Sequence, residues 1–303
     1  MSGNGSFAGD AGSELLLLAQ EGGARTIFVV GAGRNAGKTT TLRAIYNAAC
    51  ARGLRTALAS IGRDSEEALG AGVPKPRLWL QPQTIFATAR GALPRTPACR
   101  ILKLSQLRTA AGALLYARTE LPGFYDLVGP PTAAGLREVL AELGTASDLL
   151  IVDGAIDRIA AIAGSDGAIV VACGAAGAQT QDEAVDEVAG LAARLAIPRF
   201  DDGAAALEIE GALTAARVAR LLAAGESRQI VVRDPTQIAL SGKAARETLA
   251  RLSIRCRRPL HVIAATVASI GPERSFEPQN FRSAVAAATG LPTYDVYRGS
   301  AVA

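Results

Sequence analysis

The sequence predicts an α/β protein of three layers (α/β/α), in which a mostly parallel β-sheet has helices on both faces. From Arg25 onward, short apolar runs alternate with longer segments rich in Ala, Arg and Leu, the order expected of repeated β–α–β units. Several runs are apolar throughout, as expected for strands that are covered on both faces. With 303 residues and 49% hydrophobic side chains, the chain can bury the core of one large unit or of two smaller ones.

The predicted strands are apolar runs bounded by turn-forming or charged residues. They lie at residues 26–30, 56–61, 149–152, 168–172, 206–209, 229–232, 260–265 and 292–296. The first helix is expected to begin at Gly37 to Thr39 and to end near Arg52. Thr132 and Thr180 stand where they would cap two further helices.

Three parts of the chain differ in composition. Residues 1–24 are rich in Gly, Ser and Ala and are expected to form a mobile N-terminal arm or a covering helix. Residues 25–200 form the predicted core, with an insertion at about 70–122 whose prolines exclude a plain helix. We expect the insertion either to hold a substrate or partner or to be a packed connector. Residues 201–303 return to shorter β–α units that complete the sheet or form a small lobe.

The charge and the single histidine exclude several classes of function. A formal charge of +4, spread over interspersed residues without a basic run, does not favour nucleic-acid binding. His261 is the only histidine, so a histidine-rich zinc centre cannot form within one chain. Because it lies in an apolar run, we expect His261 to be a core side chain whose ring nitrogens have hydrogen-bond partners.

The cysteines and the N-terminal segment indicate a cytoplasmic protein without a membrane partner. The four cysteines are widely spaced and are expected to be reduced, with Cys173 a buried structural thiol. The early apolar run at 15–19 is too short to span a membrane, and no Lys or Arg precedes it as in a signal peptide.

The most informative segment passes from an apolar strand through a loop of small residues into a helix. The loop has the spacing [A/G]xxxxGK[S/T], with Ala32 at its first position and Gly37, Lys38 and Thr39 at its end. Backbone N–H groups of such a loop surround a phosphate, so bulky side chains must be absent. Lys38 would contact the β and γ phosphates, and Thr39 would ligate Mg²⁺. The predicted nucleotide-binding residues are Gly33, Arg34, Asn35, Ala36, Gly37, Lys38, Thr39 and Thr40. The alternative is a glycine-rich turn with a capping threonine.

Two carboxylates follow predicted strands and are candidates for holding Mg²⁺. Asp153 ends a buried apolar run, where a carboxylate holds the metal through water, and Gly154 lets the chain approach the phosphates. Asp64 follows the strand at 56–61 and is the candidate second metal ligand or water-orienting residue. The alternatives are a helix cap for Asp153 and a solvated turn for Asp64.

At these residues the sequence resembles the branch of P-loop NTPases that includes dethiobiotin synthetase, the accessory protein MobB, and the MinD and nitrogenase iron-protein relatives. The resemblance covers residues 29–40 and 151–154, with Asp64 between them. The iron-protein relatives have a signature lysine where this chain has Gly33, so their intersubunit lysine is absent. The substrate-contacting lysine of dethiobiotin synthetase has no clear equivalent.

Segments 31–42, 60–66 and 126–132 also resemble the reactivase-associated P-loop subunit found with adenosylcobalamin-dependent lysine 5,6-aminomutase. That resemblance implies an ATPase that acts on a protein partner, here a cobalamin-dependent mutase.

The sequence therefore favours a Mg²⁺-dependent P-loop NTPase whose hydrolysis controls or reactivates a partner enzyme. Lys38 and Mg²⁺ would neutralise the developing charge while Asp64 orients water, with Asp153 in the same catalytic group. ATP is favoured because no guanine-reading Asn-Lys-x-Asp motif occurs, although GTP stays open. Residues 233–236 end a strand where related folds contact the base.

Two other functions use the same loop. One is an ATP-dependent small-molecule kinase or a dethiobiotin-synthetase-like carboxylate-activating ligase, with its substrate against the insertion. The other is a nucleotide-binding scaffold without turnover. A homodimer is left open in each case.

Overall fold

The computed structural model describes residues 10–31, 33, 35–61, 77–154, 167–271 and 273–297. Its largest feature is a sheet of nine strands. These are β1 (Thr26–Gly31), β2 (Thr56–Ser60), β4 (Ile85–Ala89), β5 (Cys99–Thr109), β6 (Gly112–Thr119), β8 (Leu149–Gly154), β9 (Ala168–Gly174), β15 (His261–Ala268) and β16 (Thr293–Asp295).

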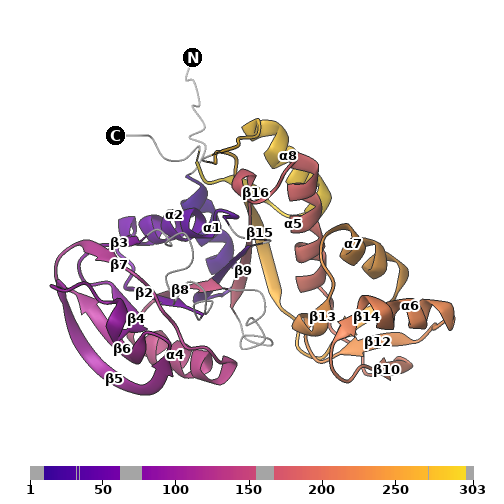
Figure 1. Cartoon of the computed structure of the whole chain (residues 1–303), viewed down its shortest axis with the longest axis horizontal. Coiled ribbons are helices and arrows are strands. Elements are labelled where there is room, and N and C mark those ends of the chain that lie inside the picture. Colours follow the sequence, from indigo (N-terminus) through magenta and orange to yellow (C-terminus); the bar gives the residue numbers. More distant parts are fainter. Residues whose placement is uncertain are drawn as a thin grey trace.

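The strand order is β16-β15-β9-β1-β8-β2-β4-β6-β5. Neighbours from β16 to β4 pair in parallel, and β6 pairs antiparallel with β4 and β5. The principal helices packed on the two faces are α1 (Ala11–Glu21), α2 (Lys38–Ala51), α4 (Ala133–Ala146), α5 (Gln181–Leu195) and α8 (Pro278–Thr289). The three-layer α/β/α fold with a mostly parallel sheet is thereby confirmed (Figure 1).

Strand β1 is apolar throughout because its two sets of alternate side chains enter two cores. Phe28 and Val30 belong to the core shared with α4, α5 and α8. Ile27 and Val29 belong to the core shared with α1 and α2. Both faces of the strand are therefore covered, which accounts for the lack of polar alternation.

The N-terminal helix α1 is a packed element of the domain. Leu15, Leu16 and Ala19 are fully buried. The helix crosses α2 so closely that a Cβ added at Gly12 would lie 2.1 Å from the carbonyl oxygen of Ala44. Residues 11–21 thus form the covering helix, and residues 1–9 lie outside the described residues.

The described part of the insertion consists of strands, none of which was predicted. Strands β4, β6 and β5 extend the central sheet, while β3 (Leu78–Leu80) and β7 (Gly123–Tyr125) form a separate antiparallel ribbon. The prolines fall between strands: Pro82 lies in the turn before β4, and Pro94 and Pro97 lie between β4 and β5. The prolines thus exclude a plain helix, as predicted, but they interrupt β-structure without excluding it.

The region after residue 200 forms a small lobe and also adds two strands to the central sheet. A small lobe contains the parallel strands β10 (Ala206–Glu208), β12 (Gln229–Val232) and β14 (Ile254–Cys256), the pair β11 (Leu213–Thr214) and β13 (Ile238–Ala239), and the helices α6 (Ala215–Ala223) and α7 (Gly242–Arg251). This lobe has its own core. The chain then returns to the central sheet as β15 and β16 (Figure 1).

His261 is exposed at the first position of β15, so its prediction as a core side chain was wrong. The residues of β15 are buried only from its fourth position onward, whereas His261 lies at the amino edge of the sheet. Among the described residues, no helix is long and apolar enough to cross a membrane.

Candidate functional site

The loop between β1 and α2 lies at the carboxyl edge of the central sheet and is shaped by glycines. Gly37 has φ = 82°, in the left-handed region that favours glycine. A Cβ added there would lie only 2.6 Å from the Cβ of Ala268, at the end of β15. The loop can therefore approach the neighbouring strand only because position 37 has no side chain.

Two further glycines keep the loop close to the sheet. A Cβ added at Gly174, the last residue of β9, would lie 2.7 Å from the carbonyl oxygen of Asn35. A Cβ added at Gly31 would lie 2.9 Å from Cγ of Lys38. Gly174 thus allows the loop to sit against β9, and Gly31 leaves room for the stem of Lys38.

The loop lies at the point where the strand order of the sheet reverses. The chain leaves β1 through α2 toward β2, whereas it leaves β9 toward β15, on the opposite side. Crevices at such switch points are the usual ligand sites of parallel α/β sheets. A cavity of about 40 Å³ lies here, lined by residues that include Gly33, Ala36, Gly174 and Glu187.

The N-terminus of α2 presents backbone donors without a side-chain cap. Gly37 supplies no capping side chain, and no acidic residue lies in the first turn. In contrast, Thr132 and Thr180 cap α4 and α5 by accepting hydrogen bonds from Gly135 N (3.1 Å) and Glu183 N (3.2 Å), as predicted. The first N–H groups of α2 and the positive end of its dipole are suited to an anion.

Lys38 folds back over the loop. Its Nζ donates a hydrogen bond of 3.1 Å to the carbonyl oxygen of Gly33. Thr39 and Thr40 follow in the first turn and are half-buried. The ammonium group and the uncapped helix end therefore belong to one loop, where both can act on the same anion.

Asp153 lies on the strand next to the loop. Strand β8 pairs in parallel with β1 and β2, and Asp153 is in register with Val29 and Ser60. Its half-buried side chain is therefore near the carboxyl edge where β1 continues into the loop. Arg34 and Asp64, the other predicted site residues, lie outside the described residues.

Several residues of this site were missed from the sequence. Gly174 at the end of β9 and Ala268 at the end of β15 pack closely against the loop. In the interior, the Oγ1 atoms of Thr41 and Thr266 are 2.7 Å apart. These partners are more than 100 residues away in sequence. The only available signal was that each contributing strand ends in small residues at one shared edge.

Cys173 is a buried thiol, as predicted. It donates a hydrogen bond of 3.2 Å to the carbonyl oxygen of Ala184, and burial raises its pKa to about 12. All four cysteines are free thiols, and no group of three or more His, Cys, Asp or Glu side chains within the described ranges could hold a metal ion.

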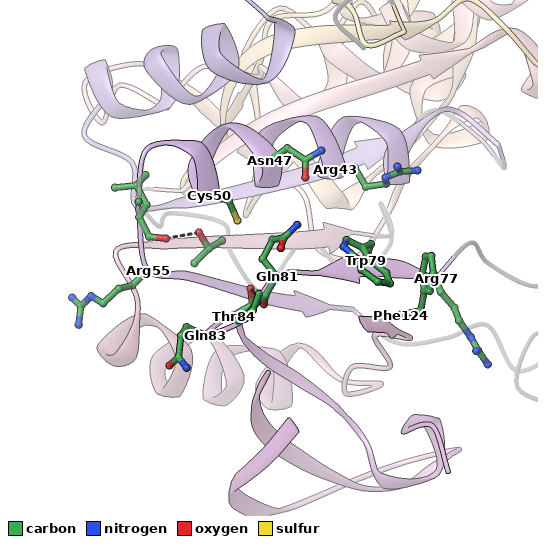
Figure 2. A pocket seen from close by; sticks show the side chains of 14 residues that line it. Arg43, Asn47, Cys50, Arg55, Arg77, Trp79, Gln81, Gln83, Thr84 and Phe124 are labelled. Atoms are coloured by element: carbon green, nitrogen blue, oxygen red, sulfur yellow. Dashed lines mark hydrogen bonds between the residues drawn. The ribbon is translucent and has the colours of Figure 1, made fainter. Parts of the chain in front are cut away.

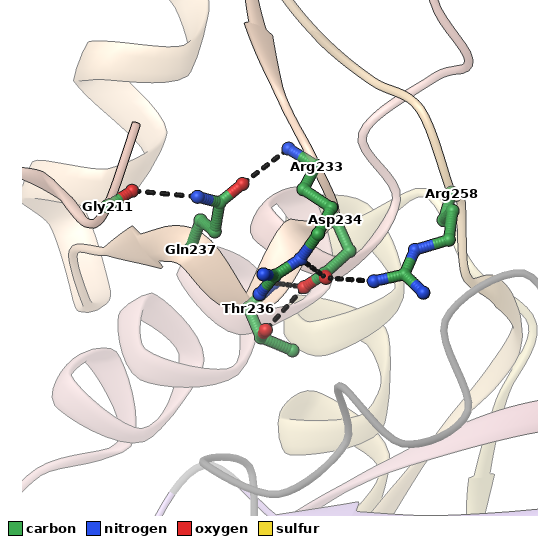
Figure 3. Close-up of polar contacts among 6 residues, drawn as sticks. All are labelled: Gly211, Arg233, Asp234, Thr236, Gln237 and Arg258. Carbon is green, nitrogen blue, oxygen red and sulfur yellow. Dashed lines mark hydrogen bonds and ion pairs between the residues drawn. The ribbon is translucent and has the colours of Figure 1, made fainter. Parts of the chain in front are cut away.

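Residues 233–236 follow β12 in the small lobe, whose three-stranded sheet is separate from the central sheet that carries the candidate nucleotide loop. The carboxylate of Asp234 is fully buried and accepts hydrogen bonds from Arg233 Nε (2.9 Å), Arg258 (3.3 Å) and Thr236 N (3.1 Å) (Figure 3). This network joins the ends of β12 and β14, so we assign it a structural role in the lobe.

Asp234→Asn is expected to destabilise the lobe by about 1–3 kcal/mol, because the buried group loses charge-assisted hydrogen bonds. Burial alone would raise the pKa of Asp234, but hydrogen bonds from Thr236 and Arg233 and the charge of Arg233 lower it overall. The stabilisation is therefore complete above the ordinary aspartate pKa of about 3.9 and disappears as the pH falls through the lower folded-state value. Urea unfolding of both proteins across this range tests the prediction; an unchanged difference between them at low pH contradicts it.

Comparisons with protein-family models, with curated proteins and with solved structures find no match to this chain.

Proposed function

We propose that the protein is a Mg²⁺-dependent P-loop nucleoside triphosphatase of the cytoplasm, which uses ATP in preference to GTP to control or reactivate a partner enzyme. The observation that carries the proposal is the loop between β1 and α2. Glycines at positions 31, 37 and 174 let this loop pack closely against the sheet. A Cβ atom added at any of the three would collide with the loop or with a residue next to it. This cradle places the backbone donors at the start of α2 and the Lys38 ammonium on one loop, as binding of a phosphate chain requires.

The donor set of the site suits Mg²⁺. The Thr39 hydroxyl and the Asp153 carboxylate are hard oxygen donors, the type this ion prefers. When bound, Mg²⁺ would neutralise charge on the phosphate oxygens. The N–H groups at the start of α2 bind and orient the phosphates, and Lys38 stabilises the charge that develops on the transferred group. Asp64 is proposed to orient the attacking water.

A protein partner and a small-molecule substrate are distinguished by what accelerates turnover. Phosphate release from Mg²⁺·ATP is measured with the chain alone, with a purified adenosylcobalamin-dependent lysine 5,6-aminomutase, and with a panel of metabolite carboxylates. We expect slow basal release that the enzyme partner accelerates. Acceleration by a carboxylate alone would instead identify a kinase or ligase, and nucleotide binding without release would identify a scaffold.

Asp153→Asn tests the metal-holding role. Because Asp153 is proposed to hold Mg²⁺ through water, the variant is expected to lose about 10- to 100-fold in Mg²⁺-dependent hydrolysis. Raising the Mg²⁺ concentration should restore part of the rate. The matched control is Asp182→Asn on α5, which should hydrolyse ATP like the parent. A variant at position 153 with an unchanged Mg²⁺ requirement contradicts the assignment.

A further inference from the structure

A groove of about 1110 Å³ lies beside α2, away from the candidate nucleotide loop (Figure 2). One wall is a stripe of α2, formed by Arg43, Asn47 and Cys50, which recur at helical spacing. The opposite wall is the β3–β7 ribbon. The groove continues past the end of α2 to Arg55 and to the turn before β4.

The ribbon turns one face to the interior and the other to the groove. Leu78 and Leu80 are buried, whereas the alternate residues Arg77, Trp79 and Gln81 line the groove. Phe124 is the cross-strand partner of Trp79 and lies on the same face. The groove wall is thus the regular outer face of a two-stranded ribbon.

Trp79 and Phe124 form an exposed aromatic pair on this wall. Their ring centroids are 4.7 Å apart in an edge-to-face arrangement. Trp79 is 42% exposed and Phe124 is 55% exposed, although both are large apolar side chains. Aromatic side chains presented this way are typical anchors of protein interfaces.

The charged side chains that line the groove, among the described residues, are arginines. Arg43, Arg55 and Arg77 line it, and no Asp or Glu is among the lining residues that the structure describes. Arg55 and Arg77 are paired with Asp148 and Asp126, at 2.6 and 3.4 Å, but their side chains remain 69% and 61% exposed. Arg43 is also exposed, and no ion pair to it occurs within the described ranges. Figure 2 shows Arg43 and Arg77 at the same end of the groove as Trp79.

We propose that this groove binds an acidic polypeptide segment of a partner protein, with an aromatic or apolar side chain of the segment packed on Trp79 and Phe124. The arginines supply charge complementarity, and the aromatic pair supplies the apolar contact. The residues that line the groove run along α2 from Arg43 to Cys50 and continue past its end to Arg55, and this elongated form favours a peptide over a compact ligand.

The groove and the candidate nucleotide site share one helix. α2 begins at Lys38 in the phosphate loop and provides Arg43, Asn47 and Cys50 to the groove. A segment bound there would contact the same rigid element that holds the nucleotide. Its role as the docking site of the regulated enzyme rests on the proposed function, whereas the binding itself does not.

Trp79 is the only tryptophan of the chain and reports directly on the groove. The probe is a random copolymer of Glu and Tyr; poly-Glu, a Lys/Tyr copolymer and N-acetyltyrosine serve as comparisons. We expect the Glu/Tyr copolymer to shift Trp79 emission to shorter wavelength in a saturable manner, and salt to weaken its binding. Poly-Glu should bind more weakly, and the Lys/Tyr copolymer should not bind.

Variants place the binding on named residues, with the affinity measured by anisotropy of labelled Glu/Tyr copolymer. Arg43→Glu and Phe124→Ala should each weaken binding on the order of tenfold. Arg282→Glu, an exposed arginine on α8, is the matched control and should bind like the parent. Equal binding by all three variants overturns the proposal, as does binding of the Lys/Tyr copolymer. Competition by N-acetyltyrosine at the affinity of the copolymer overturns it in favour of a small-molecule site.

Two crossed measurements separate this proposal from the nucleotide proposal. Phe124→Ala should bind an ATP analogue like the parent, and Lys38→Ala should bind the copolymer like the parent. If the parent binds the nucleotide analogue but not the copolymer, the groove proposal fails and the nucleotide proposal stands. If the parent binds the copolymer but not the analogue, the nucleotide proposal fails and the groove proposal stands.

Discussion

Lys38→Ala is expected to lower ATP hydrolysis by at least about 100-fold, the scale of losing one preorganised charge-stabilising group. The side chain lies over the loop, with Nζ 3.1 Å from the carbonyl oxygen of Gly33. No other lysine is near in sequence, since the remaining three are Lys75, Lys103 and Lys243. The rate of phosphate release under saturating Mg²⁺·ATP measures the effect.

The fold should survive this change, because Lys38 is only half-buried and its hydrogen bond is exposed. Circular dichroism and the urea midpoint are therefore expected to stay at the parent values. Lys243→Ala is the matched control, since this lysine is exposed on α7 in the small lobe, 3.9 Å from Glu247. Equal rates of ATP hydrolysis for Lys38→Ala and Lys243→Ala would contradict a role of the loop between β1 and α2 in hydrolysis.

Gly37→Ala should impair both stability and nucleotide binding. The left-handed φ of 82° alone costs a non-glycine residue about 1–2 kcal/mol. The added methyl group would also lie 2.6 Å from the Cβ of Ala268, so the loop must move away from β15. We expect a lower free energy of unfolding and a nucleotide affinity that is lower by at least about tenfold, because the N–H groups lose their common orientation.

Gly53→Ala separates backbone strain from the collision. Gly53 also has a left-handed φ, of 71°, but nothing lies within 4 Å of an added Cβ. That variant should show only the strain cost in urea unfolding and should bind nucleotide like the parent. If both variants behave alike in the two assays, close packing of the loop against β15 has no part in binding.

The sequence was sufficient to predict the elements around the loop, because their signals are local. The buried run of β1, the small residues of the loop and the helix after Gly37 are adjacent in the chain, and their order alone predicts an anion site. The end of β8 was also predictable, since Asp153 terminates a continuous apolar run. What the loop packs against was not, because Gly174 and Ala268 are brought to it only by the order of the strands.

The insertion could not be predicted, for a different physical reason. Strand β5 is at the edge of the sheet, and two register shifts interrupt its pairing with β6. Its side chains are mostly exposed and include Arg100, Lys103 and Arg108, so the period-two pattern of a half-buried strand is lost. His261 illustrates the converse: it adjoins an apolar run, but its place at the beginning of β15 exposes it.

The central claim, that the loop between β1 and α2 is a nucleotide site, is tested most directly by calorimetric titration with a non-hydrolysable ATP analogue and Mg²⁺. The account predicts one analogue bound per chain, with weaker binding when Mg²⁺ is removed and when Lys38 is replaced by alanine. Absence of binding at millimolar analogue, or binding that is unchanged in Lys38→Ala, would contradict it.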